Sequence, residues 1–207
     1  MGQPHAFVLC WTAASVTMRS MRWLAERIMR LRGWRFAGEK PPYSKFVAIG
    51  APHTSNWDFM LFLSVVSHFH LPARAIGKNT LVRWPFGKLM RRLGIIPLDR
   101  DSGQGMVEQM VDEFAAADEM ALVIAPEGTR RRAEYWRSGF YRIAIEAQVP
   151  VVLTYIDFDG KVAGIGPTIH PSGDIDADME IIREFYASIR GLRPENQGPI
   201  RLRPDSV

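Results

Sequence analysis

The segment 46–70 reads FVAIGAPHTSNWDFMLFLSVVSHFH and sets the architecture of the chain. Its first six residues, Phe46 to Ala51, form a short apolar run that stops at a proline, which is typical of a buried strand. From Trp57 to His70 the segment is again strongly apolar, and it is long enough for a helix. A buried strand that leads directly into a helix is the repeating unit of α/β proteins. We therefore expect an α/β fold.

The same alternation of strand and helix continues along the chain. Apolar runs of strand length alternate with stretches of helical spacing at residues 73–77, 81–93, 95–98, 105–117, 120–125 and 140–148. Residues 151–158 and 162–169 flank the turn Asp159-Gly160 and predict a β-hairpin. Residues 175–190 carry apolar side chains at helical spacing and predict a closing helix.

These elements predict one layered α/β domain with a mixed, mostly parallel central sheet flanked by helices, preceded by an amphipathic helix. The chain divides into an N-terminal extension at 1–17, the amphipathic helix at 18–36, the α/β domain at 37–193 and an irregular tail at 194–207.

The composition is that of a globular protein with a weak positive charge. Lys and Arg number 26 and Asp and Glu number 22, which gives a net charge of +4 at pH 7. This charge favours anionic partners. A single cysteine, Cys10, excludes an intramolecular disulfide and a zinc site built on several thiolates. His68 and His70 would point in different directions on a helix, so we expect no metal site.

The N-terminal apolar run from Ala6 to Met18 is shorter than the roughly 20 residues that a membrane-spanning helix needs. Basic residues follow this run instead of preceding it, which is the wrong order for a secretion signal. Met18 is a second candidate start of translation, so we expect residues 1–17 to be an extension without a function of its own.

Residues 18–36 have the composition of a basic amphipathic helix. Apolar and aromatic side chains alternate there with arginines, and Glu26 is the only acid. The arginines are Arg19, Arg22, Arg27, Arg30, Arg32 and Arg35. Such a segment can lie in a membrane interface, with its aromatic rings at the level of the lipid headgroups. The alternative is a helix that packs on its own domain.

Two residues of the opening segment have the spacing of a general base and its carboxylate partner. His53 and Asp58 would point about 140° apart on one continuous helix, so they meet only if His53 lies in the loop before it. Thr54, Ser55 and Asn56 are favourable N-cap residues and predict that the helix begins there, with Asp58 in its first turn. A carboxylate on one imidazole nitrogen leaves the other free to accept a proton. The alternative is a capping aspartate beside a structural histidine.

Two further segments end or begin strands with polar residues. The first is Pro126-Glu127-Gly128-Thr129-Arg130, which follows the buried run 120–125. The second spans residues 94–100 and reads GIIPLDR. Each one alone is a weak signal, because an arginine at a strand end is usually a solvated surface charge.

Taken in order, the three segments resemble the glycerolipid acyltransferase family, which includes the 1-acylglycerol-3-phosphate acyltransferases. His53 and Asp58 match the family's His-x-x-x-x-Asp motif. The other matching residues are Gly94, Ile96 and Arg100 in a Gly-x-Ile-x-x-x-Arg block, Pro126 to Arg130 in a Pro-Glu-Gly-Thr-Arg block, and Val149 and Pro150 in a fourth block. The fourth block departs from the family pattern, because Leu153 or Thr154 stands where a second proline is usual.

The resemblance implies transfer of a fatty acyl group from acyl-CoA or acyl carrier protein to the hydroxyl of a lysophospholipid, with 1-acylglycerol-3-phosphate giving phosphatidic acid. His53 would be the general base and Asp58 would orient it. There is no Gly-x-Ser-x-Gly motif and Cys10 lies outside every block, which favours direct transfer without an acyl-enzyme. The thioester is then a co-substrate, and we expect no other cofactor.

The resemblance also implies how the acceptor phosphate is bound. Arg100 and Arg130 would bind the phosphate through their guanidinium groups. Glu127, Gly128 and Thr129 would shape the same pocket. Lys78 aligns with a lysine that is frequent in the family and is expected to join them.

A lipid product requires access to a bilayer, so we expect a peripheral or monotopic protein on the cytoplasmic face of the cell membrane, at an anionic lipid surface. Nucleic-acid binding would leave His53 and Asp58 unexplained, and we expect none. Two alternatives stay open. One is acylation of another lysolipid or an amino-lipid, and the other is a non-catalytic protein that binds anionic lipid.

Overall fold

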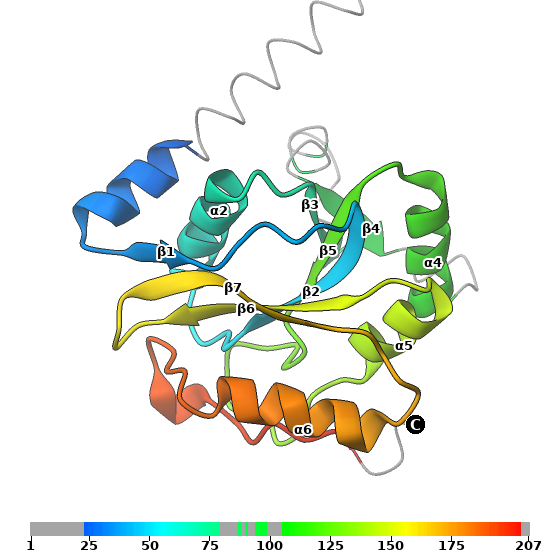
Figure 1. Cartoon of the computed structure of the whole chain (residues 1–207). Helices are drawn as coiled ribbons and strands as arrows, with labels where there is room; N and C mark the ends of the chain where they lie inside the picture. The colour runs from blue at the N-terminus through cyan, green and yellow to red at the C-terminus, as the bar shows by residue number, and fades with distance from the viewer. Residues whose placement is uncertain (1–22, 79–86, 88–89, 91–93, 99–104, 204–207) are drawn as a thin grey trace, which may run out of the picture.

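The computed structural model describes residues 23–78, 87, 90, 94–98 and 105–203. Within these residues, seven strands form one sheet in the order β1-β7-β6-β2-β5-β3-β4 (Figure 1). The strands are β1 (Arg35–Ala37), β2 (Lys45–Ala51), β3 (Ala73–Lys78), β4 (Ile95–Leu98), β5 (Met120–Ile124), β6 (Val151–Asp157) and β7 (Val162–Ile169). Only the hairpin pair β6 and β7 is antiparallel in this sheet. The predicted mixed, mostly parallel sheet is confirmed.

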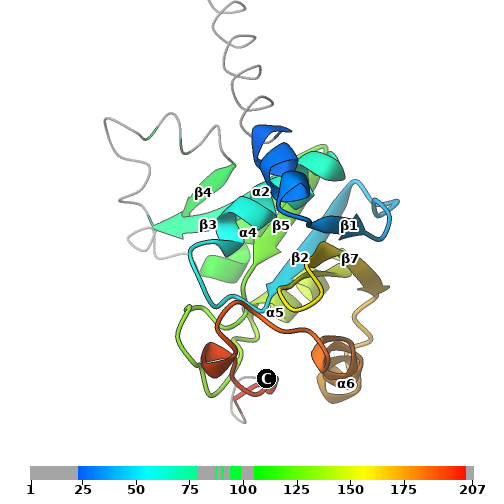
Figure 2. The same ribbon diagram turned by 90° about the vertical axis from the view of Figure 1, so that its left-hand side faces the viewer.

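Helices cover both faces of the sheet (Figures 1 and 2). These helices are α2 (Asp58–His68), α4 (Met106–Ala116), α5 (Gly139–Glu146) and α6 (Ile175–Tyr186), and a short 3-10 helix, η2, spans Pro194–Asn196. Residues 23–31 form a further helix, which lies beside α2 on one face. Helices α4, α5 and α6 lie on the other face, which gives three layers. None of the described helices is long and apolar enough to span a membrane.

The alternation of side chains along β2 builds the two cores. Phe46 and Ala48 belong to the core beneath α2, whereas Val47 and Ile49 belong to the core beneath α4, α5 and α6. Successive side chains of a strand point to opposite faces, and here both faces are covered. This double burial explains why the strand reads as a continuous apolar run.

The parallel register brings three strand ends together at one edge of the sheet. Ile49 of β2 is level with Ile124 of β5, and Ala51 of β2 is level with Tyr155 of β6. The loops that leave β2 and β5 therefore emerge side by side. Ligands of open α/β sheets bind at this carboxyl edge.

The prediction of an amphipathic helix over 18–36 is wrong at the C-terminal end of the helix. The described helix stops at residue 31, and Gly33 follows with a φ of 83°. Its N–H and that of Trp34 bond back to carbonyls of the last turn, a glycine-terminated helix end. Arg35 then begins β1, which pairs with β7. The sheet therefore begins two residues before residue 37, where the α/β domain was predicted to start. Residues 18–22 lie outside the described part.

The tail was expected to be irregular, but part of it is ordered. It contains η2, and Leu202 forms an isolated bridge with Trp136. Ile200 and Leu202 pack against the core that carries α4, α5 and α6. The helix predicted at 81–93 falls almost entirely outside the described residues.

Candidate active site

His53 and Asp58 meet at the carboxyl end of β2. His53 lies in the loop after β2, and Asp58 is the first residue of α2. The Nδ1 atom of His53 lies 3.2 Å from Oδ2 of Asp58. A carboxylate at Nδ1 favours the tautomer that carries its proton there, which leaves Nε2 as a proton acceptor. The imidazole is one-third exposed, at 33%, whereas the Asp58 side chain is 4% exposed.

The loop itself holds the Asp58 carboxylate. The backbone N–H groups of Thr54 and Ser55 donate to Oδ2, both at 2.8 Å. The Ser55 hydroxyl donates to Oδ1 at 2.6 Å. Burial by itself would raise the pKa of Asp58, but the hydrogen bonds from His53, Ser55 and Thr54 outweigh it and hold that pKa below its ordinary value. Asp58 is therefore an anion at neutral pH.

The prediction that α2 begins at a polar cap residue is wrong. Trp57 occupies the N-cap position and makes no capping bond through its side chain. The Ser55 hydroxyl accepts the N–H of Trp57 at 3.1 Å while it donates to Asp58. Thr54 and Ser55 thus hold the Asp58 carboxylate instead of occupying the N-cap position.

Glu127 connects the His53 loop to the loop after β5. Its Oε1 atom accepts a hydrogen bond of 3.0 Å from the backbone N–H of His53. Its Oε2 atom is buried and has no hydrogen-bond partner among the described residues. Burial raises the pKa of Glu127, and the bond from His53 offsets this only in part. Glu127, in the loop after β5, thus holds the backbone of His53 in place.

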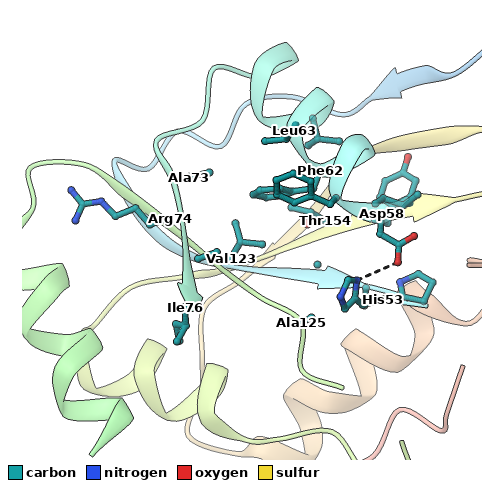
Figure 3. A pocket seen from close by; sticks show the side chains of 18 of the residues that line it. His53, Asp58, Phe62, Leu63, Ala73, Arg74, Ile76, Val123, Ala125 and Thr154 are labelled. Atoms are coloured by element: carbon teal, nitrogen blue, oxygen red, sulfur yellow. Dashed lines mark ion pairs between the residues drawn. The ribbon is translucent and has the colours of Figure 1, made fainter. Parts of the chain in front are cut away.

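An apolar cavity of about 610 Å³ opens beside His53 and Asp58, a size typical of ligand sites. Figure 3 shows these two residues at one end and Ala73 and Arg74 at the other. Phe62 of α2 lies across the cavity from the sheet. The cavity is therefore an elongated apolar space with one polar end.

Small residues create this space between α2 and the sheet. Gly50, Ala51, Ala73, Ala75 and Ala125 all line it. Larger side chains at these positions would fill the gap beneath α2, as they do elsewhere in the core. The cavity thus follows from where the small residues fall on the strands.

The remaining predicted site residues are placed as follows. Gly94, with a φ of 84°, precedes β4, and Ile96 is buried within β4. Pro126 and Pro150 are buried in loops that precede and follow α5, respectively. Gly128, Thr129 and Arg130 are exposed in the loop after β5. Lys78 is the last residue of β3, with its side chain outside the described part, and Arg100 lies outside the described residues.

Two further contacts, which the sequence did not indicate, support β2 and the loop that carries His53. Gly191 packs so closely on the loop that a Cβ there would lie 2.7 Å from Oγ1 of Thr54, and the N–H of Arg193 donates to the same hydroxyl at 3.3 Å. Tyr186 of α6 donates to the carbonyl oxygens of Ile49 and Thr154. The contacts with Ile49 and Thr54 join residues more than 130 positions apart, and no local sequence pattern predicts them.

Comparison with protein families assigns the class. A model of the Acyltransferase family matches residues 35–156, which is more than half of the 207-residue chain. The chain therefore belongs to the Acyltransferase family. The match contains His53, Asp58 and the loop after β5.

A similar solved structure is the 1-acyl-sn-glycerophosphate (LPA) acyltransferase PlsC from Thermotoga maritima. It shares 15% sequence identity at a TM-score of 0.59, and the alignment covers 84% of this chain and 80% of that chain. At this low sequence identity, the structural similarity shows a common fold and nothing more. A search of curated proteins found no significant match.

Proposed function

We propose that this protein transfers a fatty acyl group from acyl-CoA or acyl carrier protein to the hydroxyl of 1-acylglycerol-3-phosphate, which yields phosphatidic acid. One observation carries the proposal. The His53 imidazole, bound through Nδ1 to a buried carboxylate, lies at the mouth of an elongated apolar cavity. A general base beside an apolar slot suits a reaction that joins an acyl chain to a hydroxyl.

The proposed mechanism is direct transfer. Nε2 of His53 takes the proton of the acceptor hydroxyl, whose oxygen attacks the thioester carbonyl. The C–O bond forms, the C–S bond breaks, and the imidazolium returns the proton to the departing thiolate. Asp58 keeps the imidazole oriented and stabilises its positive charge. A base positioned in this way accelerates a reaction by roughly 10²–10⁴.

The cavity would hold the acyl chain. Its lining is mainly aliphatic and aromatic, and the ionisable residues that line it at the loop end are His53, Asp58 and Tyr155. With the chain under α2, the thioester carbonyl would lie at the polar end, next to His53. Burial of each methylene contributes about 0.8 kcal/mol, so a long chain supplies ample binding energy.

The headgroup side would lie over the loop after β5. Arg130 and Thr129 are exposed there, beyond Glu127 and Gly128. Arg130 offers the guanidinium that suits a phosphate. In this proposal Arg100 and Lys78 contribute further positive charge.

The membrane partner is supported by apolar side chains exposed near the cavity. On the helix of residues 23–31, Ala25 and Met29 face the core, whereas Leu31 is 85% exposed. Trp57 and Phe59, at the start of α2, are 55% and 50% exposed, and Phe59 also lines the cavity. Arg32 lies over the Trp57 ring at 5.8 Å, which joins the two elements at the surface. We propose that this face lies on anionic lipid at the cytoplasmic side of the membrane.

The test is acyl transfer from labelled palmitoyl-CoA and palmitoyl acyl carrier protein to a panel of lysolipids and amino-lipids. Wild type is expected to label the diacyl product, and His53→Ala to lose roughly 10²–10⁴ of the rate. His170→Ala removes an exposed histidine that contacts Tyr43 and should keep full activity. Labelling of another acceptor would correct the substrate. No labelling by wild type, together with binding to anionic vesicles, would favour a non-catalytic lipid-binding protein.

A further inference from the structure

Arg137 lies against the loop that carries Glu127, although it belongs to none of the blocks that define the site. Its backbone N–H donates to the carbonyl oxygen of Pro126 at 2.9 Å. A Cβ atom on Gly128 would lie 2.7 Å from Nε of Arg137 and 3.3 Å from its Cζ. The guanidinium therefore occupies the space that a side chain at position 128 would need.

Two features of Gly128 fit this arrangement. Its φ is +65°, a conformation that residues with a side chain rarely adopt. Its missing Cβ lets the Arg137 guanidinium lie directly on the loop. The loop after β5 thus presents a cation at its surface with no intervening side chain.

Among the described residues, no carboxylate neutralises the charge on Arg137. Arg137 is exposed and forms no ion pair with any described residue. Some described arginines do have carboxylate partners, namely the exposed Arg30, Arg142, Arg183 and Arg201 and the half-buried Arg74, whereas other exposed arginines such as Arg27 and Arg131 form no ion pair with the described residues. Arg130, two residues after Gly128, likewise forms no ion pair with the described residues. Guanidinium groups without a counter-charge beside one loop favour an anionic ligand.

The position of Arg137 relates it to the reacting end of the site. Gly128 directly follows Glu127, and Glu127 holds the backbone of His53 at 3.0 Å. The guanidinium therefore lies on the same loop assembly as the general base, and it is not among the residues that line the apolar cavity. A ligand whose reacting group lies at His53 could therefore place an anionic group against Arg137, on the loop after β5.

We infer that Arg137 binds the phosphate of the acceptor lysophospholipid. The inference rests on the proposed function and adds a specificity-determining residue to it. A guanidinium can contact two phosphate oxygens at once, which gives orientation as well as affinity. The phosphates of a coenzyme A donor have the same chemistry, so the experiment must separate the two sources.

Steady-state kinetics with the full chain separate them. With a soluble acceptor, 1-hexanoylglycerol-3-phosphate, Arg137→Gln is expected to raise the acceptor KM about tenfold or more. The donor KM and kcat should stay within about threefold of wild type. Arg137→Lys keeps the charge without the planar fork and should recover part of the loss. An unchanged acceptor KM, or a rise in the donor KM alone, overturns the inference.

The matched control is Arg142→Gln, which removes an equal charge from α5. Arg142 is exposed and pairs with Glu146 at 3.8 Å. Its kinetic constants should equal those of wild type. If both arginine variants behave alike, the effect of Arg137 is one of net charge and the inference fails.

A binding measurement keeps the inference independent of turnover. In the His53→Ala background, calorimetry with 1-hexanoylglycerol-3-phosphate and with the phosphate-free 1-hexanoylglycerol compares affinities directly. Arg137→Gln should weaken binding of the phosphate ligand about tenfold or more and leave the neutral ligand unchanged. Equal affinities with and without Arg137 overturn the inference. Wild type that binds the phosphate ligand but transfers no acyl group would instead contradict the proposed function.

A double-mutant cycle tests the contact itself. Gly128→Ala places a methyl group where the guanidinium lies. Because both changes would then disturb one phosphate contact, the losses in affinity of Gly128→Ala and Arg137→Gln should not add. Additive losses would show that Gly128 and Arg137 act separately and would count against the inference.

Discussion

The carboxylate of Glu127 holds the backbone of His53, with Oε1 of Glu127 3.0 Å from the nitrogen of His53. The two residues are 74 positions apart and come from loops after two neighbouring parallel strands. The position of the imidazole therefore depends on two supports. Asp58, at the start of α2, holds the ring, and Glu127 holds the main chain from the loop after β5.

Removal of the Glu127 support should lower turnover more than substrate affinity. Glu127→Ala leaves the partly buried N–H of His53 without its acceptor, and we expect kcat to fall at least about tenfold, equivalent to roughly 1.4 kcal/mol. Glu127→Gln keeps a carbonyl oxygen and should lose much less. Glu134→Ala, an exposed change seven residues later, is the control. Equal activity of the Ala and Gln variants would exclude a positioning role.

The same carboxylate should make stability depend on pH. Burial raises the pKa of Glu127 above its ordinary 4.5. Between the unfolded and the raised folded pKa, the native state binds more protons than the unfolded chain, so stability falls as pH rises through this window. The Glu127→Gln variant has no carboxyl group at this position, so it does not lose this stability as pH rises. The Tm of the variant relative to wild type should therefore increase from pH 4.5 to pH 8, and a constant difference in Tm would contradict the raised pKa.

Asp58→Asn should impair catalysis and should also make stability depend less on pH in the acid range. The amide cannot accept all the hydrogen bonds that the carboxylate accepts, and it stabilises an imidazolium poorly. We therefore expect kcat to fall by about 10²-fold or more. The lowered pKa of Asp58 means that its contribution to stability is full above pH 3.8 and is lost as pH falls through the folded pKa. Thermal unfolding between pH 2.5 and 7 should show a weaker acid dependence in the variant.

Filling the far end of the cavity should change the preferred acyl chain. Ala73 lines the end opposite His53, so Ala73→Leu should shorten the space and favour decanoyl over palmitoyl thioesters by about tenfold in kcat/KM. The extra methylenes in a packed region cost about 1–3 kcal/mol of stability. Ala115→Leu, at an exposed site on α4, is the size-matched control. An unchanged ratio of the two substrates would mean that the acyl chain lies elsewhere.

The exposed apolar face should govern binding to lipid. Leu31→Glu places a charge on the helix of residues 23–31 and should weaken binding to phosphatidylglycerol vesicles in a sedimentation assay by about tenfold. Ile181→Glu makes the same change at a 48% exposed position on α6, on the opposite side of the sheet. We expect that variant to bind as wild type does. Similar losses in both variants would point to net charge instead of insertion.

Much of the fold could be predicted because its signals are local. The strand and helix at residues 45–68 and the hairpin of β6 and β7 follow from apolar periodicity and a turn. The contact of His53 with Asp58 was predictable for the same reason, since five residues and one helix start fix their geometry. The end of the first helix was missed, because β1 forms only through its pairing with β7, more than 120 residues away.

The sequence by itself determined which residues are candidates for the chemistry and that strands alternate with helices, because side-chain type and spacing are properties of short segments. The tertiary structure decided what those residues contact. The bond from His53 to Glu127 exists only because β2 and β5 are neighbours in the sheet. The cavity exists only because the glycine and alanines of β2 and β3 meet Ala125, which follows β5, beneath α2. Strand order and packing are set by the balance of contacts over the whole chain, which no single segment contains.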